Sequence, residues 1–452
     1  MTLIAIPEHG WLWRGTGNPA PNDTDRAVVP PVRFERLRRL DERLGQGNTR
    51  AFEWFGDRAR ARQYVGVMQV AGLVVEILPK ITPAIDGGQH FARRNLLHML
   101  QLAGDVPTRE RGMASQDARK GPLSETLMAI FARRLLGELS LGRDQRYQVR
   151  QRNERALKGK LLFGPHLRVN AVHRERFFVE HAELSSDTPL NQALKAACRL
   201  LLGAARLPDT QEALRRCLLC LQGVTDTIPT AQTLDRITVT RRSARFEPLL
   251  NFCRLVLGQR APTATAGQDQ SFALLFDMNV VFERYISAFI RRHVMPTFPW
   301  HTVHLHARHH WRYLLHARDD ARGVLRLEPD MLISRTHSPD ERVMTLDTKW
   351  KRLDQSGKRR GVAREDLYQL FAYAQRYGCP HNVLLYPKVQ GSRSEDYVIP
   401  GRNRQDSGAI CARFVDLDRD LQRDRAALTD ELRHTLSEFI EERWEPGDVL
   451  EI

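Results

Sequence analysis

Residues 324–354 of the chain read VLRLEPDMLISRTHSPDERVMTLDTKWKRLD. Within this stretch, one short apolar run follows Asp330 and a second leads into Asp347-Thr348-Lys349. The polar segment SRTHSPDE between the two runs has the composition of a turn. The pattern therefore predicts two adjacent antiparallel strands, with an acidic residue at the start of one and another at the end of its neighbour.

The polar side chains of these two strands are expected to converge. Asp347 and Lys349 are two residues apart, so the pleat of a strand places them on the same face. Asp330 comes from the neighbouring strand. Carboxylates are suitable ligands for the Mg²⁺ ions of phosphodiester hydrolysis, and the backbone carbonyl of Thr348 is a further candidate ligand. An amine can orient or deprotonate the attacking water and stabilise charge on the phosphate.

The specificity of this signal comes from its context. The tripeptide D-x-K alone occurs by chance in many sequences, and a surface ion pair is the simplest alternative explanation. A Pro-Asp pair followed one hairpin later by an apolar run that ends in D-x-K is much more selective, especially within a helix–strand–strand–helix order. We therefore predict a C-terminal α/β domain of the PD-(D/E)XK restriction-endonuclease-like kind, acting as a Mg²⁺-dependent endodeoxyribonuclease with Asp330, Asp347 and Lys349 as catalytic residues.

Flanking segments supply further candidates. Glu283, in the predicted helix FERYISAFI, can face the metal or its waters, or it can be an ordinary exposed helical acid. The later segment REDLYQLFAYAQRYG predicts a helix on which Gln369 and Tyr373 share one face, within reach of a scissile phosphate or the attacking water. The segment HNVLLYPK predicts another strand of the same sheet.

The length of 452 residues predicts two or three domains, in an α+β multi-domain chain. Residues 1–90 read as a β-rich N-terminal domain, with a hairpin in RQYVGVMQVAGLVVEILPKI that closes at Pro79. Residues 91–262 read as a mainly helical middle region. The polar stretch TATAGQDQS, residues 263–271, reads as a linker, and residues 272–452, starting with a helix, as the nuclease domain.

The formal net charge of +15 favours a polyanionic partner such as nucleic acid, although an arginine-rich proteome also explains it. The most basic stretch, residues 143–160, can be a solvated face or can contact phosphate or an acidic partner surface. There is no signal peptide and no apolar run of membrane-spanning length, so we expect a cytoplasmic protein without a membrane association.

Two segments could form zinc sites, but the sequence signal for each is weak. Cys217 and Cys220 form a C-x-x-C without a second pair of ligands, which favours two buried thiols on a helix. The segment HTVHLHARHH, residues 301–310, places His304 and His306 on one face if it is a strand. Its interleaved arginines favour a basic strand facing DNA over a zinc site.

The blocks LEPDMLI, TLDTKWK and DLYQLFAYA resemble the nuclease domain of the McrC family, the cleaving subunit of modification-dependent McrBC-type restriction systems. Upstream, VGVMQVAGLVVEILPKI with RRNLLHML, LKGKLLF and SSDTPLNQALKAA resemble that family's earlier regions. The resemblance implies catalytic roles for Asp330, Asp347 and Lys349 and supporting roles for Glu283 and Gln369. Thr348 and Trp350 stand where the family's usual D-A-K-Y has Ala and Tyr, and neither change removes a ligand side chain.

The resemblance also implies partners, namely DNA, with methylated foreign DNA as the expected substrate, and a separate McrB-like AAA+ GTPase hexamer. The chain itself has no GxxxxGK[ST] phosphate-binding loop. In the family, the N-terminal half docks into the GTPase ring, and residues 143–160 and the loops of the β-rich domain are candidates for that contact. Two other functions are possible: a stand-alone repair or defence nuclease, and a non-catalytic adaptor that stimulates an NTPase.

Overall fold

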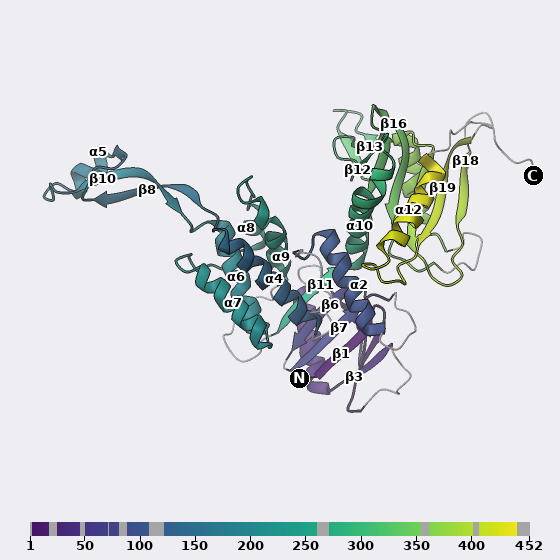
Figure 1. Cartoon of the computed structure of the whole chain (residues 1–452), viewed down its shortest axis with the longest axis horizontal. Helices are drawn as coiled ribbons and strands as arrows, with labels where there is room; N and C mark the ends of the chain where they lie inside the picture. The colour runs from purple at the N-terminus through teal and green to yellow at the C-terminus, as the bar shows by residue number, and fades with distance from the viewer. Residues whose placement is uncertain are drawn as a thin grey trace, which may run out of the picture.

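The computed structural model describes residues 2–17, 25–45, 50–70, 72–80, 88–107, 122–259, 271–353, 361–400 and 406–440. The N-terminal part contains two sheets (Figure 1). The first has the order β1-β7-β6-β11, with bounds Thr2–Pro7, Leu73–Leu78, Tyr64–Val70 and Phe272–Asp277. The second has the order β3-β2-β5-β4, with bounds Arg26–Val29, Trp11–Arg14, Arg58–Ala61 and Phe52–Phe55.

The predicted hairpin is confirmed, because β6 and β7 pair antiparallel from Gly66 opposite Ile77 to Val70 opposite Leu73. Helix α1 (Pro31–Gly45) begins at a proline, within the part of the chain predicted from the sequence to be β-rich. A proline fits the first helical turn, where its missing N–H has no intrahelical partner in any case. The buried apolar side chains of α1 belong to a core that includes residues of both N-terminal sheets.

The helix expected to begin at Phe272 begins six residues later. Phe272–Asp277 form β11, whose apolar side chains are buried, and β11 pairs antiparallel with β6. A short apolar run with no clear periodicity fits a buried strand as well as a helix, and here the long-range pairing with β6 decides. The N-terminal sheet therefore includes a strand from beyond the predicted linker, of which residues 263–270 lie outside the described residues.

The middle region is largely helical. Its helices are α2 (Gly88–Ala103), α4 (Leu123–Ser140), α6 (Pro189–Ala204), α7 (Pro208–Cys220), α8 (Ala231–Asp235) and α9 (Glu247–Gly258), with a 3-10 turn at Ala244–Phe246. Helix α6 begins with Pro189 in the first turn and with the Thr188 side chain accepting a hydrogen bond from Asn191 N.

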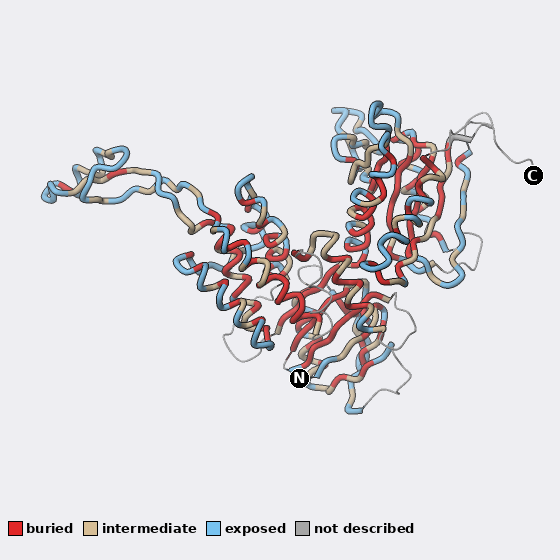
Figure 2. The backbone as a smooth tube through the Cα atoms, viewed as in Figure 1, coloured by how far each residue is buried: buried red, intermediate tan, exposed pale blue. Residues whose placement is uncertain are grey.

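The basic stretch between α4 and α6 is not helical. It forms a long arm of two antiparallel strands, β8 (Arg146–Glu154) and β10 (Phe177–Ser185), with the short strand β9 (Lys160–Leu161) and helix α5 (Phe163–Val169) near its tip. The arm projects away from the helices, and most of its residues are exposed or half-buried (Figures 1 and 2). The expectation of a mainly helical region missed these strands.

The C-terminal part is a six-stranded sheet between helices. Its strand order is β12-β15-β16-β17-β19-β18, with bounds His301–Leu305, Met331–Arg335, Ser338–Thr348, His381–Pro387, Asp406–Val415 and Glu395–Pro400. The helices are α10 (Met278–Phe289), continued by a π turn at Ile290–Val294 and a 3-10 turn at Met295–Thr297, then α11 (Arg364–Tyr377) and α12 (Arg425–Ile440). A separate hairpin joins β13 (Arg312–His316) and β14 (Gly323–Leu327).

Alternate side chains of the central strands enter different cores. Leu346 of β16 belongs to the core that α10 and α12 share, whereas Leu384 of β17 packs with the α11 side chains. The sheet is therefore covered on both faces. None of the described helices is long and apolar enough to cross a membrane.

Candidate active site

The Pro-Asp and D-x-K motifs meet at one edge of the C-terminal sheet. Strands β15 and β16 pair antiparallel, with Met331 opposite Leu346, so Asp330 and Asp347 lie next to each other across the pair. Since Met331 and Leu346 both enter the core of α10 and α12, their neighbours Asp330 and Asp347 point to the opposite face, which α11 covers. The predicted antiparallel pair is present. The run before Glu328 does not extend it, because that run forms β14 in the separate hairpin.

Lys349 lies inside a small polar network. Its Nζ is 2.5 Å from Asp347 Oδ2 and donates to Gln369 Oε1 at 3.0 Å. The amide of Gln369 donates to Asp347 Oδ1 at 3.4 Å and to the Tyr373 hydroxyl at 2.6 Å. Tyr373 in turn donates to the carbonyl of Glu328 at 3.1 Å. Helix α11 therefore supplies two side chains that hold the lysine and the aspartate in one arrangement.

Asp330 is held by the residue that follows Asp347. The backbone N–H and the hydroxyl of Thr348 both donate to Asp330 Oδ2, each at 2.7 Å. The role expected for Thr348 from the sequence was that its backbone carbonyl binds the metal. The structure gives its N–H and side chain a different contribution, because they fix the orientation of the Asp330 carboxylate relative to β16.

We expect Thr348→Val to raise the Mg²⁺ concentration needed for half-saturation by about tenfold, since outer-shell partners of metal-binding carboxylates contribute at this level. Valine keeps the backbone N–H and the shape of the side chain but loses the hydroxyl donor. Calorimetric titration with Mg²⁺ measures the effect, and Thr348→Ser, which keeps a hydroxyl, is the matched control. Equal Mg²⁺ binding by the valine and serine variants would contradict this role.

Burial and mutual repulsion raise the pKa values of the two carboxyl groups. Desolvation, followed by the charge of Glu283, raises the pKa of Asp330 to about 6. Desolvation, followed by the charge of Asp330, raises the pKa of Asp347 to about 7. Two adjacent buried carboxylates are unfavourable without a compensating cation, which is the electrostatic situation of an acidic metal site.

Burial lowers the pKa of Lys349, but the carboxylate of Asp347 outweighs this effect, and the net pKa is raised. The amine therefore stays protonated at neutral pH. In this arrangement Lys349 acts as a cation that can stabilise charge on a phosphate, rather than as a base.

Glu283 lies at the side of this cluster. Its Oε1 is 3.5 Å from His306 Nδ1, and the backbone N–H of His306 donates to the carbonyl of Asp330 at 2.9 Å. Desolvation raises the pKa of Glu283, and the charge of Asp347 adds to that shift. Glu283 is thus close enough to the two aspartates for its charge to act on them, and its side chain contacts the imidazole of His306.

The residues fit a magnesium ion with few protein ligands. Asp347 Oδ2 is buried without a hydrogen bond, and its charge is balanced by the Lys349 ion pair. Among the described residues, no group of three or more His, Cys, Asp or Glu side chains could hold a metal ion. Two carboxylates and a backbone carbonyl suit Mg²⁺, which retains several waters and is often held by one or two carboxylates together with substrate phosphates.

The alternative metal positions do not form such sites. Strand β12 ends at Leu305, so His304 and His306 do not share a strand face, and His304 Nε2 lies 2.9 Å from Ser334 Oγ. Cys217 and Cys220 both belong to α7, as predicted. Only Cys217 is buried and Cys220 is exposed, so the expectation of two buried thiols was half wrong.

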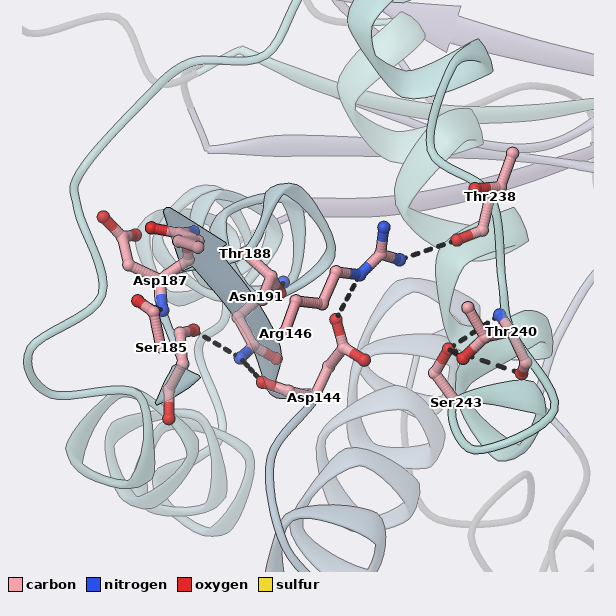
Figure 3. Close-up of polar contacts among 11 residues, drawn as sticks. Asp144, Arg146, Ser185, Asp187, Thr188, Asn191, Thr238, Thr240 and Ser243 are labelled. Carbon is pink, nitrogen blue, oxygen red and sulfur yellow. Dashed lines mark hydrogen bonds and ion pairs between the residues drawn. The ribbon is translucent and has the colours of Figure 1, made fainter. Parts of the chain in front are cut away.

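The base of the arm is a second polar cluster (Figure 3). The side-chain amide of Asn191 donates to the carbonyls of Asp144 and Ser186, at 2.9 and 2.7 Å. Arg146 donates to the carbonyl of Thr238 at 2.8 Å and pairs with Asp144 at 3.3 Å. These contacts fix both strands of the arm to the helical region, so the arm is held in one direction at its base.

The surface of the arm combines positive charge with exposed apolar side chains. Residues 146–185 contain nine arginines and lysines but four acidic residues. The large apolar side chains exposed along the arm are Tyr147, Val149, Leu157, Phe163, Leu167, Val169, Val172 and Leu184. Exposed apolar groups gathered on one projecting element indicate a surface for binding another macromolecule.

The Pro-Asp and D-x-K motifs thus bring two carboxylates and an amine together at one edge of the sheet. Comparison with known proteins gives the family. Residues 59–387 match the model of the McrBC 5-methylcytosine restriction system component family. The chain belongs to this family, which confirms the resemblance to McrC found in its sequence motifs.

The chain is also similar to solved structures from Thermococcus gammatolerans. One is the half-complex from a tetradecameric assembly of McrB AAA+ hexamers with bound McrC, with a TM-score of 0.64, 19% identity and coverage of 97% of this chain and 100% of that chain. The other is a McrBC complex, with a TM-score of 0.49, 21% identity and coverage of 65% of this chain and 88% of that chain. A search of the curated proteins finds no match.

Proposed function

We propose that the chain is the DNA-cleaving, McrC-type subunit of a McrBC-like restriction system, and that it hydrolyses phosphodiester bonds with Mg²⁺. The observation that carries this proposal is that Asp330, Asp347 and Lys349 lie together at the ends of two paired strands. The two carboxyl groups are buried, and their pKa values are raised. Family membership supports the restriction-system context.

In the proposed site, Asp330, Asp347 and the Thr348 carbonyl hold Mg²⁺, which supplies Lewis-acid stabilisation of the phosphate and activation of water. Lys349, kept protonated by Asp347, binds a non-bridging phosphate oxygen and stabilises the charge that builds there. Gln369 orients Lys349 through the hydrogen bond to Oε1. Glu283 is proposed as a supporting acid at the edge of the site.

The proposal includes two partners. The first is DNA. The net positive charge of the chain favours binding to DNA, because positive charge releases counterions from the phosphate backbone. The second is a McrB-like AAA+ GTPase hexamer, as in the similar Thermococcus gammatolerans assembly, which contains McrB AAA+ hexamers with bound McrC. We propose that the arm formed by residues 146–185 makes the main contact with that GTPase.

The test is plasmid cleavage with Mg²⁺, with and without the cognate GTPase and with methylated or unmethylated DNA. Cleavage that requires the GTPase supports the proposal. Cleavage by the isolated chain at full rate would instead indicate a stand-alone nuclease. Stimulation of the GTPase without cleavage under any condition would indicate an adaptor.

We expect Mg²⁺ affinity to fall by about 20-fold between pH 8 and pH 6, because Mg²⁺ must displace protons from carboxyl groups with pKa values near 6 and 7. Both groups are ionised at pH 8, Asp347 is mostly protonated at pH 6, and Asp330 is about half protonated there. Calorimetry at several pH values measures the change. An affinity independent of pH in this range would argue against these carboxyl groups as the ligands.

A further inference from the structure

A buried contact joins the N-terminal sheet to the strand that carries the candidate lysine. The indole Nε1 of Trp350 donates to both carboxylate oxygens of Glu8, at 3.1 and 3.0 Å. Both residues are buried, and they are 342 positions apart in the sequence. Trp350 directly follows Lys349, whereas Glu8 directly follows β1 of the N-terminal sheet.

Glu8 is itself fixed to the end of the N-terminal sheet. Its backbone N–H donates to the carbonyl of Leu78, the last residue of β7, at 2.9 Å. Its carboxylate also accepts from the backbone N–H of Lys80 at 3.2 Å. Arg352, two residues after Trp350, donates to the carbonyl of Lys80. The ends of β1 and β7 therefore contact the segment after β16 through two separate side chains.

The Trp350 ring is also fixed from the side of the helix that precedes the sheet. It packs against Phe282 of α10, with ring centroids 5.2 Å apart. Helix α10 continues directly from β11, the strand that pairs with β6 of the N-terminal sheet, and Met278 N donates to the carbonyl of Gln63. Trp350 thus lies where the N-terminal sheet, α10 and β16 come together.

If this contact served only to stabilise the fold, it would be an unfavourable choice, because the Glu8 carboxylate has to be buried. Burial raises the pKa of Glu8 to about 7, although the charge of Lys80 opposes the shift. Well-packed apolar side chains are often at least as stabilising as a buried charged pair. A directional hydrogen bond, in contrast, fixes the position of the indole, and the backbone of Lys349 lies one peptide bond away.

We propose that Glu8, acting through Trp350, is a positioning residue for Lys349, and that this contact couples the N-terminal sheet to the candidate active site. The inference rests on the proposed function. The N-terminal sheet belongs to a different part of the chain from the nuclease motifs, and the contact of Glu8 with Trp350 links the two. A displacement of that sheet therefore passes to Lys349 through the indole. Both side chains are buried, so neither is offered to DNA as a contact.

The test variant is Trp350→Phe, which removes the indole donor and retains an aromatic ring against Phe282. Trp54→Phe is the matched control, because Trp54 Nε1 donates to the buried carboxylate of Asp41 at 2.8 Å and its ring packs on Phe34 at 5.1 Å. That pair lies within the N-terminal part, and neither of its members is a nuclease-motif residue. Both variants lose the same kind of hydrogen bond.

We expect Trp350→Phe to lower kcat for GTPase-dependent cleavage by about 10- to 100-fold, with KM for DNA nearly unchanged, since a small misplacement of a catalytic group has effects of this size. Trp54→Phe is expected to keep the wild-type kcat. Glu8→Gln, which still offers an oxygen to the indole, is expected to retain more activity than Glu8→Leu. Stimulation of the partner GTPase, measured in each sample, reports whether the variant is folded.

Hydrogen exchange provides a readout without metal or DNA. Lys349 N donates to the carbonyl of Leu385 at 2.9 Å, and weaker positioning of this segment should speed exchange of a peptide covering residues 346–353. Faster exchange in Trp350→Phe but not in Trp54→Phe supports the inference. Equal exchange and equal kcat in the two variants overturn it. If wild-type protein cleaves no DNA, the proposed function fails, and the exchange comparison still decides whether Glu8 and Trp350 position Lys349.

Discussion

Asp347→Asn is expected to reduce DNA cleavage by at least about 10³-fold, because it removes one of the two carboxylates proposed to bind Mg²⁺ and the charge partner of Lys349. Asparagine has nearly the same shape and still accepts a hydrogen bond from Gln369. The loss should therefore appear in kcat and in Mg²⁺ binding rather than in folding. Plasmid cleavage in the presence of the GTPase, with calorimetric titration of Mg²⁺, measures both effects.

Asp366→Asn is the control for this variant. Asp366 is another buried carboxylate of the same region, but its oxygens contact Lys351 Nζ, at 2.9 and 3.2 Å, and the Tyr386 hydroxyl. We expect this control to keep most of the cleavage activity. GTPase stimulation should be normal in both variants. Cleavage by Asp347→Asn at a rate similar to that of the control would refute the assignment of the site.

The sequence allows the central hairpin to be predicted because its information is local. Two apolar runs and a polar turn specify β15 and β16 within one short stretch, and the strand period places Asp347 and Lys349 on one face. Gln369 and Tyr373 are also predictable as one helical face, because they are four residues apart. Local periodicity is sufficient for these features.

Elements defined by long-range pairing are harder to predict. Strand β11 is a short apolar run whose partner, β6, lies about 200 residues earlier in the chain. Strands β8 and β10 of the arm pair mainly with each other, and the apolar side chains of β8, Tyr147 and Val149, are exposed. Their many charged residues obscured the signal in the sequence.

The same limit applies to the candidate site. The contact of Glu8 with Trp350 joins residues 342 positions apart in the sequence, and no local pattern indicates it. The one available signal was the tryptophan at a position where the resemblance predicts tyrosine. The proximity of His306 to Glu283 depends on a turn in which His306 and Ala307 have positive φ, of 51° and 45°, which the sequence did not predict.

Shortening the arm is expected to abolish productive contact with the GTPase. Glu154 and Phe177 face each other across β8 and β10, so residues 155–176 can be replaced by an Asn-Gly turn without changing the register of the remaining strands. The change removes β9, α5 and most of the exposed apolar and basic side chains of the tip. We expect stimulation of the GTPase to fall by at least about 100-fold, as the loss of several hot-spot contacts predicts.

The base of the arm should be unaffected by this deletion, because Asn191, Arg146 and Asp144 keep their contacts with the helical region (Figure 3). Mg²⁺ binding by Asp330 and Asp347 should also stay normal, since no residue of the arm belongs to that site. A control with Glu175→Gln alone, an exposed side chain near the tip, should stimulate the GTPase normally. Full stimulation by the shortened chain would contradict the role of the arm and indicate the loops of the β-rich part as the contact. Loss of stimulation with normal Mg²⁺ binding would assign partner docking to the arm and separate it from metal binding at the distant sheet edge.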